Sequence, residues 1–390
     1  MSRSCQKTLF APHVGTGSRV VPILAVAAAF LLVSACRDAP TSSTGPGGGN
    51  GGGGAFCSVP EDQLFDGGPG KDGIPSLDDP LLAGVGEAGA AYLSPEDRVI
   101  GVALGGEAIA FPHRLGWWHE ILNVDVGGVP VAITFCPLTG SGLAFDRSVV
   151  DGAEFGVSGL LFQTNLIMYD RRSEESLWFQ MARGARCGVE AGTPLDMAPS
   201  MDVTWEAWSE LHPNTRVPAH APEVGQRFDG YRYPYWTGAN VRYDEEDNPS
   251  LMFPVNAPVD QTRPPKELVL GIPRGQTAGL AFPFGILDEL GELGVAPSAV
   301  DGASVAVFWS REAQGAAAYF TRLNDRELTF AVQDGAFVDE ETGSVWSLGG
   351  AASSGELEGE HLEPVPEAYV AFWFAWAAFQ PNTSIWAPDR

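Results

Sequence analysis

The sequence predicts a mainly β protein with short helices, an α+β class in which two tandem, related β-rich repeats pack as one body. Short β-branched runs bounded by Gly or Pro recur along the chain, and long helical periodicity is scarce. The 48 Gly and 30 Pro residues provide for many turns. Hydrophobic residues make up 44% of the 390 residues, which is enough apolar surface to bury a core and excludes a wholly disordered chain.

Three runs are the clearest strand predictions, and two other segments are predicted to be short helices. Strands are expected at Arg98–Leu104, Pro130–Phe135 and Ser304–Trp309, where apolar and β-branched residues are bounded by turn formers. Short helices are expected near Trp205–Leu211 and Ile286–Leu293.

Self-similarity along the chain predicts that the body is duplicated. The aligned pairs are Ile109–Pro112 with Leu280–Pro283, Val131–Cys136 with Val305–Ser310, Asp170 and Trp178 with Asp339 and Trp346, and Trp205–Thr215 with Trp373–Thr383. The four matches occur in the same order and are separated only by small insertions or deletions. Convergent strand patterning is the alternative explanation.

The two predicted repeats differ in their reactive residues. His119 has no His counterpart, Cys136 becomes Ser310, and His212 becomes Gln380. The shared residues are mostly apolar, turn-forming or Trp, which are scaffold types. One interpretation is that chemistry is retained only in the first repeat. The other is ordinary drift at surface positions.

The N-terminus has the pattern of a bacterial lipoprotein signal. A basic region precedes the apolar stretch from Val20 to Val33, which is too short for a comfortable transmembrane helix. Small residues lead into Cys36, as in a lipobox, so Cys36 is predicted to be lipidated. An ordinary signal peptide or a short anchor is the alternative. Arg37 follows the cysteine, which leaves open which membrane holds the anchor.

The predicted organisation therefore has four parts. They are a signal peptide over residues 1–35, the lipidated Cys36 and a Gly-rich tether over 36–56, a first repeat with the candidate site over 57–230, and an inter-repeat segment with a degenerate second repeat over 231–390. The predicted location is the bacterial cell envelope, with the lipid on Cys36 as the contact with the membrane.

The charge balance excludes some partners. A formal net charge of −26 argues against nucleic acid, because affinity for phosphates comes mainly from Lys and Arg. The same charge disfavours electrostatic binding to anionic lipid. No Gly-rich phosphate loop precedes a credible helix, so no nucleotide cofactor is expected.

Cysteine usage focuses attention on one thiol. Cys5 is removed with the signal and Cys36 carries the lipid, which leaves Cys57, Cys136 and Cys187 in an oxidising compartment. Three is an odd number, so at least one of them stays free or pairs outside the chain. If a disulfide exists, we expect it between Cys57 and Cys187, because Cys136 is the candidate free thiol.

A series of short motifs runs through the body of the chain. They are Asp72–Pro75, Asp78–Pro80, Ala110–Pro112, His119–Asn123, Phe135–Gly140, Phe155–Gly159, Asp170–Arg171, Ser176–Trp178 and His212–Thr215. Through these motifs the segment from Lys71 to Arg390 resembles the DUF3179 family, a domain of unknown function. Some members of that family resemble selenoproteins. The resemblance implies a selenocysteine at the position matching Cys136, and therefore redox chemistry there.

Two departures from the family pattern are visible. Asn123 is followed by Val124 and Asp125, where the pattern prefers Asp directly. Cys187 stands where a residue other than cysteine is expected, so it is a feature particular to this chain.

Cys136, His119, Glu120 and His212 are the candidate site residues. Cys136 ends a strand-like run before Pro137, and donors at Thr139 and Gly140 could lower the pKa of its thiol. The alternative is an inert buried cysteine. If His119 and Glu120 lie on a strand they face opposite sides, so Glu120 acts as a base only if the backbone turns it toward the same space.

Two classes of function follow from these residues. The first is a thiol oxidoreductase with Cys136 as nucleophile and His119 or His212 as proton relay. In a variant of this class, Cys136, His119 and His212 bind a transition metal, copper or zinc. The second class is a non-catalytic surface-anchored binding module that uses the aromatic cluster at 231–236. Substrate, electron partner and oligomeric state are not predicted.

Overall fold

The computed structural model describes residues 56–228, 231, 236–237, 241–256 and 258–388. The predicted signal peptide, the lipid site Cys36 and nearly all of the tether lie outside these residues, as does most of the aromatic cluster at 231–236. Residues 54–390 form one unit by their internal contacts. Within the described residues, no helix combines the length and hydropathy needed to cross a membrane.

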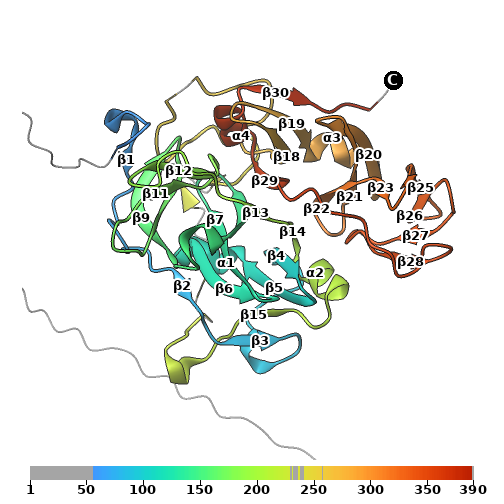
Figure 1. Ribbon diagram of the computed structural model, residues 1–390, viewed down its shortest axis with the longest axis horizontal. Helices are drawn as coiled ribbons and strands as arrows, with labels where there is room; N and C mark the ends of the chain where they lie inside the picture. Colours follow the sequence, from blue (N-terminus) through green and yellow to red (C-terminus); the bar gives the residue numbers. More distant parts are fainter. Residues whose placement is uncertain (1–55, 229–230, 232–235, 238–240, 257, 389–390) are drawn as a thin grey trace, which may run out of the picture. The chain divides into compact units, whose positions relative to one another are not determined.

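The nine-stranded sheet at the centre of the fold draws strands from both halves of the chain (Figure 1). Its members are β2 (Leu77–Asp78), β6 (Ile121–Val126), β7 (Val129–Cys136), β8 (Ser141–Asp146), β13 (Met197–Ala198), β18 (Leu268–Arg274), β19 (Ala278–Pro283), β29 (Tyr369–Phe372) and β30 (Asn382–Ile385). The strand order is β2-β6-β7-β8-β29-β18-β19-β30, with β13 paired to β8.

Two five-stranded sheets belong to the first half. One has the order β14 (Met201–Thr204), β4 (Arg98–Leu104), β5 (Glu107–Pro112), β15 (Arg216–Pro218), β3 (Leu82–Gly84). The other has the order β1 (Phe65–Asp66), β9 (Phe155–Phe162), β10 (Asn165–Asp170), β11 (Leu177–Phe179), β12 (Gly184–Cys187).

The remaining sheets are smaller and lie later in the sequence. One contains β20 (Leu293–Val300), β21 (Ala303–Ser310) and β22 (Gly315–Phe320), and another contains β25 (Phe330–Gln333), β26 (Ala336–Asp339), β27 (Val345–Trp346) and β28 (Ala352–Ser354). Two-stranded pairs are formed by β16 (Trp236–Thr237) with β17 (Val241–Arg242) and by β23 (Arg322–Leu323) with β24 (Arg326–Glu327).

The helices in the described residues are short. The α-helices are α1 (His113–His119), α2 (Trp205–Leu211), α3 (Phe284–Asp288) and α4 (Trp373–Phe379). The 3-10 turns are η1 (Glu61–Gln63), η2 (Ala88–Ala90), η3 (Arg147–Val150) and η4 (Pro222–Val224). The mainly β class with short helices is therefore confirmed.

Most of the predicted elements form where expected. The strand predicted at Arg98–Leu104 is β4, and the other two predicted strands lie within β7 and β21. The helix predicted at Trp205–Leu211 is α2. The helix predicted at Ile286–Leu293 is wrong at its C-terminal end. It stops at Asp288 because Gly291 has a φ of 118°, outside the helical region, and Leu293 begins a strand.

The same strand pairings occur in both halves of the chain. Strand β4 pairs antiparallel with β5 and β14, and β15 runs parallel to β5. In the second half, β18 pairs antiparallel with β19 and β29, and β30 runs parallel to β19. Both hairpins end on a proline, Pro112 or Pro283, whose extended backbone leads into α1 or α3. A common origin for the halves remains a prediction, and these pairings are what it would produce.

The two halves also contact each other reciprocally. The Phe372 amide of the second half donates to the Thr139 carbonyl of the first at 2.8 Å. The Thr204 amide of the first half donates to the Ala313 carbonyl of the second at 3.0 Å. In each contact the acceptor lies in a tight turn between two strands, and the donor is the last residue of a strand that precedes a helix. Each half therefore supplies a strand edge to the other.

The aligned tryptophans make equivalent hydrogen bonds. Trp208 Nε1 donates to Thr215 Oγ1 at 2.8 Å, and Trp376 Nε1 donates to Thr383 Oγ1 at 2.9 Å. These four residues are the aligned Trp and Thr positions of the duplicated motif. Each bond joins a short helix to the segment that follows it, so the motif has the same structural role in both halves.

We expect Thr215→Val and Thr383→Val each to lower the free energy of unfolding by about 1–2 kcal/mol, because each leaves a buried indole N–H without its acceptor. Urea unfolding followed by tryptophan fluorescence measures this. Thr329→Val, at an exposed position, is the control and should change little. A cost at only one of the two threonines would contradict their equivalence.

Candidate functional site

Cys136 is the last residue of β7 and is fully buried. Its Sγ lies 3.9 Å from the Thr164 carbonyl oxygen. The surrounding hydrophobic cluster includes Trp178 from the first half and Trp373 and Trp376 from the second. The thiol is therefore enclosed by side chains from both halves.

The predicted disulfide is present. Cys57 and Cys187 are bonded to each other, and Cys136 is the free cysteine among the described residues. The bond joins positions 130 residues apart, so it ties the start of the described chain to the end of β12.

Glu120 follows α1 directly and its backbone is turned by a φ of 55°, an unusual value for a residue with a side chain. Its carbonyl accepts a hydrogen bond from the Phe135 amide at 2.8 Å, which holds the end of α1 against the end of β7. His119 and Glu120 do not lie on a strand, because His119 ends a helix and Glu120 caps it.

The Glu120 side chain lines a small cavity of about 160 Å³. The other lining residues are apolar or glycine, and they are Gly67, Pro69, Ile74, Trp117, Pro137, Leu138, Val157, Gly159, Leu160, Leu161, Met252 and Phe253. Burial in this wall disfavours the carboxylate form and raises the pKa of Glu120 to about 8. Glu120 is therefore mostly protonated at neutral pH.

The Cys136 thiol feels both burial and the charge of Glu120. Burial raises the pKa of the Cys136 thiol to about 11, and the negative charge of ionised Glu120 contributes to this rise. Hydrogen bonding from Thr139 acts in the opposite direction, as the sequence suggests, but it does not prevail. Cys136 is therefore a thiol at rest, and its proton needs an acceptor if it is to react.

A buried polar network holds the turn that follows Cys136. Gln180 Oε1 accepts hydrogen bonds from Ser141 Oγ at 2.8 Å and from Asn165 Nδ2 at 2.7 Å. Asn165 also donates to Thr139 Oγ1 at 3.0 Å, and Gln180 Nε2 donates to Thr134 Oγ1 at 2.8 Å. Because these groups satisfy one another inside the core, they fix the position of Thr139 beside the thiol.

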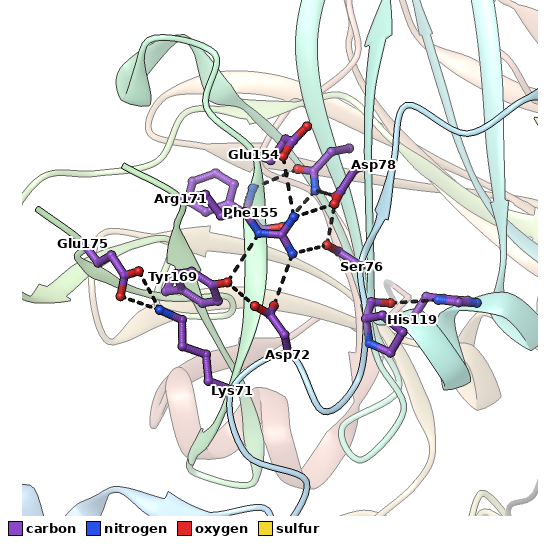
Figure 2. A network of polar contacts seen from close by, with 12 residues as sticks. Lys71, Asp72, Ser76, Asp78, His119, Glu154, Phe155, Tyr169, Arg171 and Glu175 are labelled. Carbon is purple, nitrogen blue, oxygen red and sulfur yellow. Dashed lines mark hydrogen bonds and ion pairs between the residues drawn. The ribbon is translucent and has the colours of Figure 1, made fainter. Parts of the chain in front are cut away.

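Figure 2 shows a second polar network, which fastens the segment from Lys71 to Asp78. Arg171 donates to Asp78 Oδ2 at 2.5 Å, to Ser76 Oγ at 3.0 Å and to Asp72 Oδ1 at 3.2 Å. Tyr169 donates to Asp72 Oδ2 at 2.5 Å. One arginine therefore holds three side chains of this segment.

Two further contacts complete this attachment. Asn123 Nδ2 donates to Asp78 Oδ1 at 2.7 Å, and Lys71 Nζ lies 2.5 Å from Glu175 Oε1. Ile74 within this segment, and Gly67 and Pro69 just before it, form part of the wall of the Glu120 cavity. The network thus holds part of the cavity wall in place.

His119 is turned toward this segment. Its Nδ1 lies 2.8 Å from the Pro75 carbonyl oxygen and its Nε2 lies 3.1 Å from Tyr231 Oη. Figure 2 shows the imidazole beside the segment that carries Ser76. Burial lowers the pKa of His119, so the ring is neutral and its two nitrogens connect the segment to Tyr231. Local hydrogen bonding is therefore the role that this geometry gives to His119.

His212 lies elsewhere. It caps the C-terminal end of α2, contacts the Trp208 ring at 4.1 Å between centroids with the planes tilted by 41°, and lines a cavity that shares no residue with the Glu120 cavity. The described residues contain no group of three His, Cys, Asp or Glu side chains arranged to hold a metal ion. The fold therefore does not gather Cys136, His119 and His212 into the predicted ligand set.

Sequence reasoning identified the thiol but not its surroundings. Asp72–Pro75 was visible as a motif, yet its role as a wall segment depends on contacts with Arg171, about a hundred positions later. Gln180 lies in the buried network behind Thr139, a position that no local pattern indicates. In the sequence, the only signal for the two hydrogen-bonded networks is that polar residues recur within the motifs.

We expect wild-type stability to fall relative to Glu120→Gln as pH rises. The contribution of protonated Glu120 is intact below pH 4.5, its unfolded pKa, and is lost as pH rises through about 8, its folded pKa. The full shift corresponds to on the order of 5 kcal/mol. Urea unfolding of both proteins at several values between pH 4.5 and 9 measures the difference. A pH-independent difference would mean that Glu120 is not buried as a proton-binding group.

We expect Arg171→Gln to speed alkylation of Cys136 at fixed pH, by several-fold, because the wall segment loses its main attachment. Reaction with iodoacetamide, followed by mass spectrometry, measures the rate. Arg274→Gln, which removes an exposed ion pair with Asp301, is the matched control. Equal rates in both variants would show that the segment does not control access to the thiol.

Comparison with known proteins agrees with the motifs. The sequence matches the family described as a protein of unknown function, DUF3179, over residues 71–383. That range contains Cys136, Glu120 and the residues of both polar networks. No curated protein and no solved structure matches the chain. Because the match covers most of the 390 residues, the chain belongs to the DUF3179 family.

Proposed function

We propose that this chain is an exported lipoprotein, anchored in the membrane through Cys36, that acts as a thiol-based redox protein with Cys136 as the reacting group. The observation that carries the proposal is the electrostatic coupling of the Cys136 thiol to the Glu120 carboxyl within one buried region. Titratable groups with strongly shifted pKa values in a cavity are typical of functional sites. The Cys57–Cys187 disulfide supports an oxidising compartment.

In this proposal Glu120 replaces the histidines as the proton acceptor. Ionised Glu120 takes the proton from Cys136, and the thiolate attacks one sulfur of a small disulfide. The Sγ–S bond forms as the S–S bond of the reagent breaks, and the departing sulfur takes the proton back from Glu120. A second thiol molecule then releases Cys136 by the reverse exchange.

The cavity wall favours a small, uncharged reagent. Its lining is apolar apart from Glu120, its volume is about 160 Å³, and ionised groups would lose hydration there without gaining a partner. Because Cys136 is fully buried, the reagent reaches it only when surrounding side chains move, and the proposal assigns that movement to the wall segment near Ile74. Reaction is therefore expected to be slow in the closed protein.

The pH dependence of alkylation tests the role of Glu120. If Glu120 accepts the thiol proton, Glu120→Gln should alkylate at least about tenfold more slowly than wild type at pH 9, because a positioned base is lost. If Glu120 acts only through its charge, the variant should react faster than wild type above pH 8, and that result would overturn the proton-acceptor role.

The second half provides a matched control for the thiol. Ser310 ends β21 as Cys136 ends β7, and it lines a separate cavity with Glu292 and Glu312. The Glu292 carboxylate there is exposed and paired with Arg311 at 2.5 Å. A protein with Cys136→Ser and Ser310→Cys keeps one thiol without a buried carboxyl. Its alkylation should show a single ionisation and no dependence on Glu120→Gln.

A further inference from the structure

A cavity of about 510 Å³ lies between α2, the β4–β5 hairpin and β22. Residues of both halves line it, and they are Gly101, Ala103, Leu104, Gly105, Gly106, Glu107, Ala108, Pro199, Ser200, Met201, Trp208, His212, Leu270, Ala316, Ala317, Ala318, Tyr319, Gly349, His361, Leu362, Pro364, Val365 and Ala368. Because large side chains are few on the strands that face it, the space between the halves remains open.

Two histidines line this cavity, and His212 is the half-buried one, whereas His361 is exposed. The His212 ring lies against Trp208 in a tilted arrangement, and within the described residues neither ring nitrogen has a hydrogen-bond partner. Burial lowers the pKa of His212, so the ring is neutral at neutral pH. A neutral imidazole has one donor and one acceptor. It can therefore hydrogen-bond either a hydroxyl or a carbonyl group.

The charge around the cavity selects the type of ligand. The described lining residues include Glu107 and no Lys or Arg, and the whole chain carries a formal charge of −26. An anion would find no compensating cation there, and a strongly hydrated cation would have to leave water for a mainly apolar wall. An uncharged molecule avoids both costs.

The matching helix end in the second half does not have this property. Gln380 follows α4 as His212 follows α2, but Gln380 is 1% exposed and lines none of the cavities described above. The open cavity is therefore specific to the end of α2. If contact between the halves alone created the cavity, both helix ends would line one.

We propose that this cavity binds a small, uncharged, mainly apolar ring compound whose hydroxyl or carbonyl group hydrogen-bonds to His212. The ligand ring lies against Ala316–Ala318 of β22, and the contacting rings of Trp208 and His212 form the other side. A cavity of this size holds a molecule with one or two rings. The site is independent of Cys136 and Glu120, so it gives His212 a role that the thiol chemistry does not.

Calorimetric titration of the purified protein with 4-methylphenol at pH 7 tests the proposal, and 4-methylbenzoate is the charged probe of the same shape. We expect 4-methylphenol to bind in the millimolar range or tighter, and 4-methylbenzoate to bind at least about tenfold more weakly. His212→Phe keeps a ring against Trp208 but removes the hydrogen bond, and should weaken binding about fivefold. Equal binding of the two probes, or no binding of 4-methylphenol, would overturn the proposal.

A cavity-filling pair of variants locates the site. Ala103→Phe adds a ring at the exposed rim of the cavity and should abolish binding of 4-methylphenol. Ala88→Phe adds the same ring at an exposed position outside the cavity and should leave binding unchanged. The Cys136 alkylation rate should be the same in both, which separates this site from the thiol site. Binding that survives Ala103→Phe would place the ligand elsewhere and overturn the proposal.

Discussion

The pairing of β8 with β29 is the constraint on which the rest of this structure depends. It joins strands from the two halves into one nine-stranded sheet, with Gly142 opposite Val370. A Cβ at position 142 would lie 2.7 Å from the Ile100 side chain of β4, so glycine here lets β4 pack closely on β8 at the junction. The same junction brings Trp373 and Trp376 into the cluster around Cys136. The thiol is buried because the halves are joined there.

Burial also determines the chemistry available to the site. A carboxyl in an apolar wall keeps its proton to a pKa of about 8, and a thiol in the same region keeps its proton to about 11. Once Glu120 is ionised, its negative charge adds to the burial that keeps the proton on the Cys136 thiol. At neutral pH both Glu120 and Cys136 therefore keep their protons, and Cys136 is not a thiolate that is ready to react.

The two cavities divide the candidate residues by their surroundings. Glu120 lines a small, mainly apolar cavity, and His212 lines a larger, separate cavity along the β4–β5 hairpin. His119 belongs to neither cavity wall, because both of its ring nitrogens have partners that fix the segment near Pro75. Glu120, His212 and His119 thus have three different roles, and the groups around each residue set its role.

The sequence by itself determined most of the elements, because strand runs, proline boundaries and the Trp–Thr motif are local patterns of residues. It also identified Cys136 as the free thiol and Cys57–Cys187 as the disulfide, since three cysteines allow few arrangements. Only the tertiary structure decided that Glu120, and neither histidine, faces the thiol region. That choice depends on a helix ending at His119, a positive φ at Glu120, and walls contributed by distant segments, none of which a local pattern encodes.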